Sequence, residues 1–433
     1  MTVRPITQRR RATFVRCGST IAVLVLFAHV AFAQQTIAIR DARIVPVSGP
    51  VIEKGTIVMR NGLIADVGAG VAVPAGAMVV EGQGRTVYPG LFDAGTTIGL
   101  TEVPGLMESD DFSDLGDFTP NLMAFDAFHS SSVFVAIARA GGVLHVITMP
   151  SGGMVPGQGA VMAMGGSTAY EMEVARHGPM GLDFPKLQDY VPPAYTRRRH
   201  PYVDARDYQT KMKELVEFFA RARRHMEARE KNPATARDTR YDAMIPVLKG
   251  QQPVFIDVQS GLDIKKAVEF GKEQKLNFAL VGADDAPKLA DFLKENGVRV
   301  IIGLPEPQPI REDDPFDAVC RAAATLHAQG VRFAFGTGYQ ADDRNLRHAV
   351  GMAVACGLPQ DVALRSVTLT PAEIVGVADK IGSIEKGKRA NLVLTDGDIF
   401  EYGTHIVQTF VNGVPTGVRT RYTDLADQYK DRK

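Results

Sequence analysis

Hydrophobic and polar positions divide the chain into a β-rich beginning, a long middle of alternating strands and helices, and a β-rich end. Near the beginning, short runs in which apolar and polar residues alternate predict β-strands. Asn61-Gly62 separates two of these runs, and this dipeptide strongly favours a tight hairpin turn. The strands predicted in this first part are 36–39, 56–60, 63–67 and 78–81.

From residue 88 onward, short apolar strands alternate with longer amphipathic stretches. The predicted strands are 143–148, 253–257, 278–281, 298–303 and 332–336, and the predicted helices are 131–140, 207–232, 263–274, 286–295, 317–329 and 345–356. Strands that alternate with helices indicate a parallel sheet with right-handed crossovers. With this many repeats, we expect an α/β fold closed as a (β/α)8 TIM-like barrel.

The end of the chain returns to strands at 390–395 and 406–411, followed by the turn pair Asn412-Gly413. Two β-rich ends around a barrel predict a small β-sandwich domain formed by both termini. The expected boundaries are 34–87 for the first part of the sandwich, 88–378 for the barrel, and 379–433 for the second part with a tail. Residues 151–170 and 176–206 do not fit the barrel pattern, and we expect them to form loops over one barrel face.

The first 33 residues have the pattern of a signal peptide. Arginines precede the short apolar run 21–28, and Ala31-Phe32-Ala33 forms a small-x-small cleavage site. The chain is therefore predicted to be exported to the periplasm or the extracellular space, with an N-terminal membrane anchor as the alternative. No later stretch of 18 apolar residues occurs, so the mature form is predicted to have no membrane span.

Charge and cysteine content narrow the classes of partner. The chain has 49 basic and 49 acidic residues, which does not favour nucleic acid as a partner. Removal of residues 1–33 takes away five arginines and Cys17, leaving 44 basic and 49 acidic residues and a net charge of −5.

Cys320 and Cys356 remain, both in helix-like surroundings, and we expect two buried, inert thiols rather than a disulfide.

Three stretches carry a resemblance to a known family. "RTVYPGLFDAGTTIGL" resembles the first barrel strand of the amidohydrolase superfamily, and "ARAGGVLHVITMPSGGMVPGQGAV" resembles the next unit. "LRSVTLTPAEIVGVADKIGSIEKGKRANLVLTDGD" resembles the return of that family into its β-domain. The subgroup it resembles most is that of secreted, imidazolonepropionase-like proteins. The resemblance implies a barrel fold and hydrolysis of non-peptide carbon–nitrogen bonds by a metal-activated water.

The same resemblance implies that the metal-binding motif of this chain is degraded. The first strand in the family ends Asp-Ala-His-Thr-His, whereas this chain has Gly95 and Thr97 at the two histidine positions. The eighth strand in the family ends Gly-Thr-Asp, and here Gly338 replaces the proton-shuttling aspartate. Glycine has no side chain and a threonine hydroxyl is a weak zinc ligand, so we assign no metal ligand at these positions.

Carboxylates are the residues that can take over this chemistry. Asp257 occupies the position of the fifth-strand histidine and is our candidate catalytic residue, while Asp93 and Asp284 also follow predicted strands. An all-oxygen site would favour magnesium, manganese or calcium, and a divalent metal is expected only if such a site exists. Alternatively, these aspartates cap helices or bind loop amides. His145 lies inside a strand and is expected to be a core residue.

Three hypotheses about function follow from these residues. In the first, the chain is an exported, catalytically degenerate family member, a pseudoenzyme that binds a small molecule or assembles with an intact amidohydrolase homologue. In the second, it is an active hydrolase with an oxygen-ligand site around Asp257. In the third, it is a scaffold whose barrel mouth is plugged by 151–206. Arg197–Arg199 could bind an anion or form a solvated loop, and glycines 152–159 indicate a close backbone approach.

Overall fold

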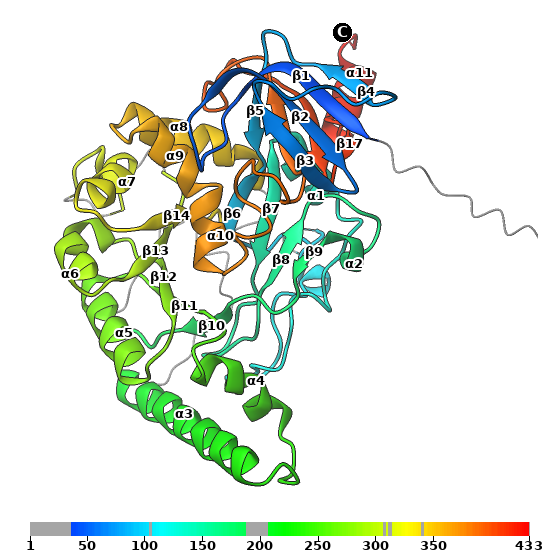
Figure 1. The fold of residues 1–433 in the computed structure, drawn as a ribbon. Coiled ribbons are helices and arrows are strands. Elements are labelled where there is room, and N and C mark those ends of the chain that lie inside the picture. The colour runs from blue at the N-terminus through cyan, green and yellow to red at the C-terminus, as the bar shows by residue number, and fades with distance from the viewer. Residues whose placement is uncertain are drawn as a thin grey trace, which may run out of the picture. The chain divides into compact units, whose positions relative to one another are not determined.

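The computed structural model describes residues 36–103, 106–187, 207–305, 309–310, 314–338 and 342–432 (Figure 1). Gln35–Lys433 form one compact unit. The predicted signal peptide, Arg197–Arg199 and most of the predicted loop 176–206 lie outside the described residues.

The first and last strands of the chain form one eight-stranded sheet (Figure 1). Its order is β17-β16-β15-β5-β1-β2-β3, and β4 pairs in parallel with β1. The strands are β1 (Ile37–Ile44), β2 (Ile52–Arg60), β3 (Leu63–Gly68), β4 (Met78–Glu81), β5 (Thr86–Pro89), β15 (Leu392–Thr395), β16 (Ile406–Val411) and β17 (Val414–Thr416). Both ends of the chain therefore share a sheet, as the sequence predicts, while the two-sheet sandwich stays a prediction.

Turn chemistry and burial explain this sheet. Asn61 and Gly62 have φ angles of 56° and 79°, which the turn between β2 and β3 requires, and the turn after β16 uses Asn412-Gly413 in the same way. Apolar side chains such as Ile39, Ile44 and Phe410 are fully buried and form a core of their own. The hairpin predictions at both turns are confirmed.

Two further sheets form the middle of the chain. The first has the order β6 (Leu91–Thr96), β7 (Val143–Thr148), β8 (Ala160–Ala163) and β9 (Glu173–Ala175), with β6 and β7 parallel. The second is entirely parallel, with the order β10 (Met180–Asp183), β11 (Val254–Val258), β12 (Phe278–Gly282), β13 (Arg299–Ile302) and β14 (Phe333–Phe335). β8 and β10 correct our prediction that 151–170 and 176–206 are loops throughout.

Backbone hydrogen bonds connect these two sheets at two places. After β14, the Gly338 amide donates to the Gly95 carbonyl at the end of β6 over 2.7 Å. At the second place, the amide of Gly181 on β10 donates to the Gly157 carbonyl over 2.8 Å, in the segment that leads into β8. A Cβ at Gly157 would lie 2.7 Å from the Leu122 carbonyl oxygen, and this tight packing explains the glycine-rich stretch before β8.

The helices of the described chain are α1 (Val133–Ala140), α2 (Ala169–Met172), α3 (Tyr208–Lys231), α4 (Thr239–Leu248), α5 (Gly261–Glu273), α6 (Ala290–Glu295), α7 (Ala318–Ala328), α8 (Leu346–Ala355), α9 (Gln360–Ser366), α10 (Leu369–Ile374) and α11 (Arg421–Tyr429). Helices α5, α6 and α7 cover the outer side of the parallel sheet (Figure 1), and the other helices lie elsewhere along the chain. Short 3₁₀ turns are η1 (Met107–Ser109), η3 (Ala286–Leu289) and η4 (Asp343–Asn345).

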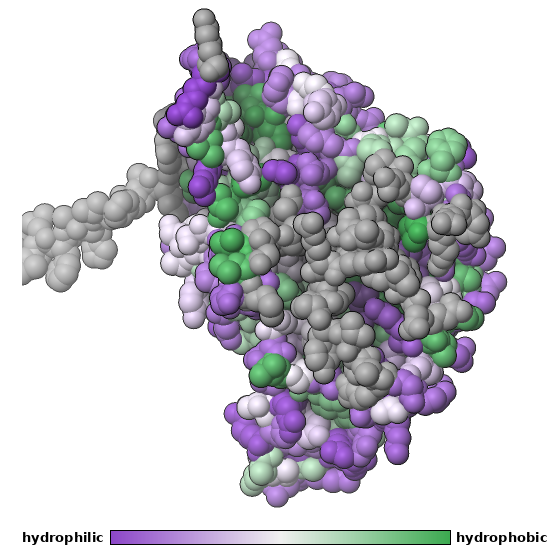
Figure 2. All heavy atoms as spheres, turned by 180° about the vertical axis from the view of Figure 1, so that it is seen from behind, coloured by the Kyte–Doolittle hydropathy of each residue, from purple (hydrophilic) through white to green (hydrophobic). Residues whose placement is uncertain are grey.

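Helix α3 shows how the sequence pattern produces this packing. Its buried residues Leu215, Phe218, Phe219 and Ala222 recur at helical spacing and form one apolar stripe. The Phe219 ring packs edge-on against Phe270 of α5, with centroids 5.3 Å apart. The opposite face of α3 is polar, and Figure 2 shows that hydrophilic residues predominate over the lower part of the molecule, where α3 and α4 lie.

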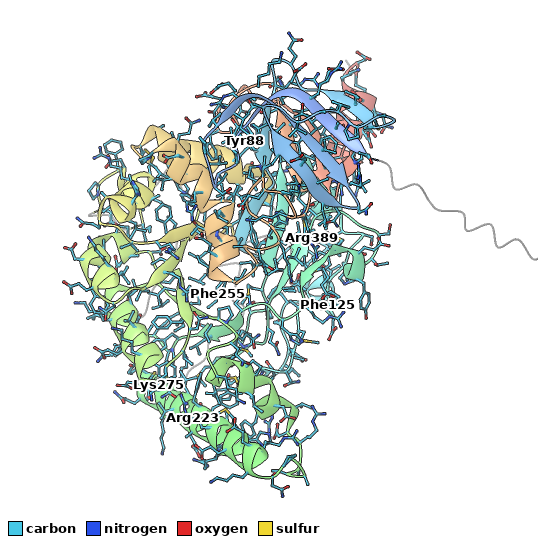
Figure 3. The ribbon with its side chains drawn as sticks, viewed as in Figure 1. Tyr88, Phe125, Arg223, Phe255, Lys275 and Arg389 are labelled. Atoms are coloured by element: carbon cyan, nitrogen blue, oxygen red, sulfur yellow. A yellow bond between two sulfur atoms is a disulfide. The ribbon has the colours of Figure 1, made fainter. Side chains whose placement is uncertain are left out.

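The second core lies between the parallel strands and their helices. Phe255 of β11, labelled in Figure 3, is one of its buried side chains. In the described part of the chain, no helix combines the length and apolarity needed to cross a bilayer.

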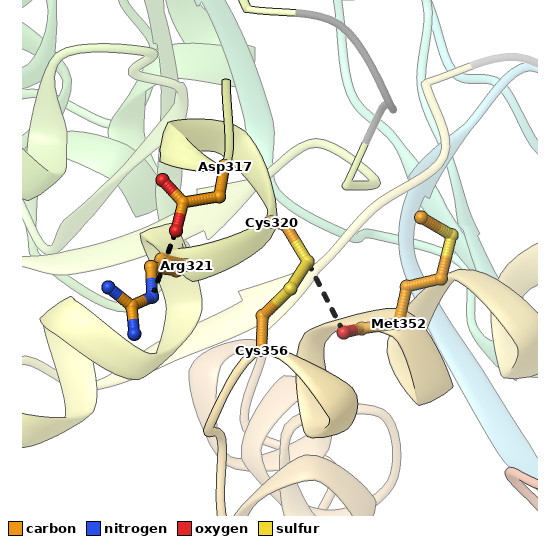
Figure 4. Close-up of a disulfide and its surroundings, with 5 residues drawn as sticks. All are labelled: Asp317, Cys320, Arg321, Met352 and Cys356. Carbon is orange, nitrogen blue, oxygen red and sulfur yellow. Dashed lines mark hydrogen bonds and ion pairs between the residues drawn. A yellow bond between two sulfur atoms is a disulfide. The ribbon is translucent and has the colours of Figure 1, made fainter. Parts of the chain in front are cut away.

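Cys320 and Cys356 form a disulfide, which corrects our prediction of two inert thiols (Figure 4). Cys320 lies in the first turn of α7 and Cys356 ends α8, with their Cα atoms 5.9 Å apart. Both residues are half-buried. Local sequence patterns do not indicate this proximity, because it arises from the packing of two helices whose cysteines lie 36 residues apart.

Candidate functional site

The carboxyl ends of the parallel strands bring together several residues singled out in the sequence. Gly95 and Gly338 are in direct contact, since the Gly338 amide donates to the Gly95 carbonyl over 2.7 Å. Thr97 directly follows β6 and is half-buried. A Cβ placed on Gly95 would have no heavy atom within 4 Å, so open space lies beside this backbone.

Asp93 is fully buried on β6 and binds backbone amides, which is one of the two roles that we considered for it. Its Oδ1 accepts hydrogen bonds from the amides of Gly95 (3.0 Å) and Thr337 (3.1 Å). Burial raises the pKa of the Asp93 carboxyl to about 6, although these hydrogen bonds oppose the shift. The carboxylate therefore ties the end of β6 to the residues after β14.

Asp343, which our sequence analysis missed, lies beside Asp93. It begins η4, only 1% of its surface is exposed, and its Oδ2 accepts a hydrogen bond from the Thr96 hydroxyl over 3.0 Å. Burial and the nearby charge of Asp93 raise its pKa well above the ordinary value. The only available signal was its position, a few residues beyond the last predicted barrel strand.

Asp257 has a second carboxylate beside it. β10 and β11 are parallel, and their register pairs Asp183 directly with Asp257, so both side chains lie on the same face. Phe184 packs against Phe270 of α5, with ring centroids 5.8 Å apart, so its side of the strand faces the helices. Asp183, one residue earlier, therefore points away from α5 and towards the opposite face of the sheet.

Asp257 affects the pKa of Asp183. Burial is the main cause that raises the pKa of Asp183 to about 7, and the negative charge of Asp257 adds to it. Lys186 and Lys211 act in the opposite direction. Asp257 also accepts a hydrogen bond from the Gln259 side chain over 2.8 Å. With this pKa, the Asp183 carboxyl can hold or release a proton near neutral pH, which suits general acid–base chemistry.

The helix starts in this region are stabilised by residues other than Asp257 and Asp284. The hydroxyl of Ser260, rather than Asp257, caps α5 by accepting from the Asp263 amide. Asp285, rather than Asp284, directly precedes η3, and its carboxylate accepts from the Gly261 amide at the start of α5 over 2.8 Å. The prediction that Asp257 caps a helix is therefore wrong. Asp285, the neighbour of Asp284, is the residue that supports the start of α5.

The histidines of the described chain are dispersed. His145 is buried on β7, where its Nε2 lies 2.6 Å from the Asn391 amide nitrogen, and burial lowers its pKa to about 3. It is thus the neutral core residue that the sequence predicts. His129 and His225 each face one aspartate, Asp111 and Asp242, over 2.8 Å.

The strand ends do not fit the zinc ion that the family resemblance implies. Gly95 and Gly338 carry no donor side chain, and both strand ends are engaged with each other through the backbone. Across the described ranges, no three His, Cys, Asp or Glu side chains are grouped so that they could hold a metal ion. Two surface hollows lie elsewhere, one along α3 and one at the beginnings of β12 and β13.

Comparison with known proteins points to one superfamily. Residues 280–420 match the model of the amidohydrolase family. A relative described as Amidohydrolase tasK, from Hapsidospora irregularis, is 24% identical over 403 residues, which cover 83% of this chain. The match spans 39% of the length of that relative.

Solved structures of similar fold agree with this match. An amidohydrolase from Thermotoga maritima MSB8 is 24% identical, with a TM-score of 0.77, and the match covers 88% of this chain and 100% of that one. Molinate hydrolase has a TM-score of 0.54 at 17% identity, covering 89% and 96% of the two chains. An adenosine deaminase from Xanthomonas campestris with bound zinc has a TM-score of 0.52 at 19% identity, covering 92% and 98%.

These structural similarities imply a TIM-barrel type domain of mixed α and β content. Taken together, the family model and the relative show that the chain is similar in sequence to amidohydrolases, and the solved structures show that it shares their fold.

Proposed function

We propose that this protein is an exported amidohydrolase-superfamily member that has lost metal-assisted hydrolysis of carbon–nitrogen bonds. In this proposal it retains the fold to bind a small molecule or to assemble with an intact homologue. The observation that carries the proposal is the backbone contact between Gly95 and Gly338. By resemblance, these positions would otherwise bear a metal-binding histidine and the proton-shuttling aspartate.

The chemistry explains why these replacements matter. A catalytic zinc needs about three protein ligands to hold it and to lower the pKa of its bound water to about 7. Gly95 contributes no side chain, and Thr97 offers only a neutral hydroxyl. Without the aspartate at position 338, the proton of the attacking water also lacks its acceptor. The site would therefore lose both the nucleophile and the base.

The disulfide supports the proposed export. Disulfides persist in oxidising compartments and are rare in the cytosol. The Cys320–Cys356 bond thus agrees with the signal-peptide pattern of residues 1–33. For the fold, we propose that the two parallel sheets close into a (β/α)8 barrel, supported by the backbone hydrogen bonds of Gly338 and Gly181.

A second candidate is a hydrolase that works through carboxylates, and the pairing of Asp183 with Asp257 favours it. Asp183, with a pKa of about 7, would donate a proton to a leaving group while charged Asp257 activates water. This reaction needs no histidine ligand.

Turnover measurements separate the two candidates. The mature protein is incubated with amide, urea and ester substrates, with and without Zn²⁺, Mn²⁺ and Mg²⁺, beside Asp257→Asn and Asp183→Asn. The first proposal predicts no turnover in any combination. Turnover that both variants abolish, while their melting temperatures match that of the wild type, would overturn it in favour of the carboxylate hydrolase.

A further inference from the structure

Two buried carboxyl groups meet where the end of β6 contacts the segment after β14. Asp93 comes from β6 and Asp343 from η4, and their exposed fractions are 0% and 1%. Burying two unpaired carboxylates costs far more free energy than burying one shared acid–carboxylate pair. Stable burial of these two carboxyls therefore requires either a bound cation or a proton on one of them.

Hydrogen bonds from other groups engage two of the four carboxyl oxygens. Asp93 Oδ1 accepts from two backbone amides, those of Gly95 and Thr337, and Asp343 Oδ2 accepts from the Thr96 hydroxyl. Asp93 Oδ2 and Asp343 Oδ1 are buried and find no donor among the other groups. Each carboxyl is among the groups that shift the pKa of the other, so the two side chains lie close together. Two facing carboxyl oxygens can form a hydrogen bond only if one of them carries a hydrogen.

Charged groups on the neighbouring elements are directed elsewhere. Arg139 of α1 donates to the Met164 carbonyl over 3.0 Å, and Glu373 of α10 pairs with Arg365 over 2.6 Å. His145 of β7, which is neutral, faces Asn391.

On the same element as Asp343, two charged residues flank it. Arg344 places its guanidinium 5.7 Å from the Tyr422 ring, and Asp342 has contacts of its own. Neither residue is among the main causes of the shift in either pKa of the pair. No described cation thus neutralises the two carboxyls.

We infer that Asp93 and Asp343 share one proton and form a metal-free clasp that holds the end of β6 against the segment after β14. The clasp lies beside the Gly95–Gly338 contact, so its protonation controls the geometry of the strand ends in the candidate site. Loss of the proton leaves two facing carboxylates that repel each other across the contact between β6 and the segment after β14. This inference does not depend on whether the site is catalytic.

The sign of the pH effect follows from the raised pKa values. Unfolded aspartates release their protons near pH 4, whereas the folded pair keeps one to a higher pH. The folded state therefore binds more protons than the unfolded state above about pH 4, and its stability falls as the pH rises through the folded pKa. A side-chain amide in place of one carboxyl can donate the hydrogen permanently, so it should remove this dependence.

The test compares wild type with Asp343→Asn and Asp93→Asn, and uses Asp361→Asn as the control. Asp361 is an exposed aspartate on α9, distant in sequence from the clasp. Melting temperatures are recorded from about pH 5 to about pH 8, with and without a chelator, together with infrared spectra at about pH 7. We expect a protonated-carboxyl band and falling stability with rising pH in wild type and control, and loss of both features in the two clasp variants.

Two results would overturn the inference. One is an infrared band and a pH dependence that are the same in the clasp variants as in wild type. The other is a wild type without the band, whose melting temperature drops on chelation, because a cation would then occupy the place of the proton. If one clasp variant fails to fold, the other variant and the wild-type spectrum still decide the question.

Discussion

Removing the Cys320–Cys356 disulfide is a perturbation whose size follows from the chain itself. The bond closes a loop between residues 36 positions apart. For a loop of that length, the chain-entropy relation gives a stabilisation of about 4 kcal/mol, because the bond restricts the unfolded chain. With an unfolding entropy of about 2 cal/mol/K per residue over the compact unit, the loss corresponds to a fall of about 5 °C in melting temperature.

The assay is thermal unfolding of the mature protein with and without a reductant, followed by circular dichroism. Cys320→Ser, Cys356→Ser and the double variant should all melt about 5 °C below the oxidised wild type, and reductant should not shift them further. Reduced wild type should match the variants, since each of these forms lacks the same bond.

Two outcomes would refute this reasoning. The first is a wild type whose melting temperature does not respond to reductant. The second is a thiol titration of the denatured, unreduced mature protein that finds both Cys320 and Cys356 free. The latter would also remove the support that the disulfide gives to export.

Three other predictions follow from local geometry. Gly282→Ala should lower the free energy of unfolding by about 2 kcal/mol, because φ is +79° and the new Cβ would clash with the Gln259 side-chain amide. Gly303→Ala, with open space at its Cβ, is the control, and equal denaturation curves for the two variants would contradict the prediction. Asp263→Ala should cost about 1–3 kcal/mol in the same assay, because its buried carboxylate accepts two hydrogen bonds beside the start of α5, and an unchanged midpoint would contradict this. Asp183→Asn should make the free energy of unfolding less dependent on pH between about 4 and 7. Burial raises the pKa of Asp183 to about 7, so below that pH its protonation favours the folded state. Parallel plots of stability against pH for variant and wild type would disprove this prediction.

Much of the fold could be predicted because periodicity is a local property. Val143–Thr148 and Ile406–Val411 have the predicted bounds, and the helix predicted at 207–232 differs by one residue at each end. β8 and β10 were missed because they are four-residue strands in Gly- and Met-rich sequence, and because long-range pairing rather than local propensity decides their conformation.

The candidate site was only partly predictable. Asp257 was found because it ends an apolar strand, and the same signal was present in Met180–Asp183, where an aspartate also ends a short apolar run. Asp343 could not be found in this way, since its partner Asp93 is 250 residues away and no strand directly precedes it. The disulfide depends on how α7 and α8 pack, which cysteine spacing does not encode.

The metal content of the mature protein tests the central claim most directly. The protein is purified without a histidine tag and examined by elemental mass spectrometry, before and after soaking with zinc, manganese and magnesium. We predict less than stoichiometric metal in every sample, because Gly95, Thr97 and Gly338 cannot hold an ion between the strand ends. One divalent ion per chain, lost in Asp257→Asn but kept in Asp361→Asn, would contradict the account and show that the carboxylates hold a metal.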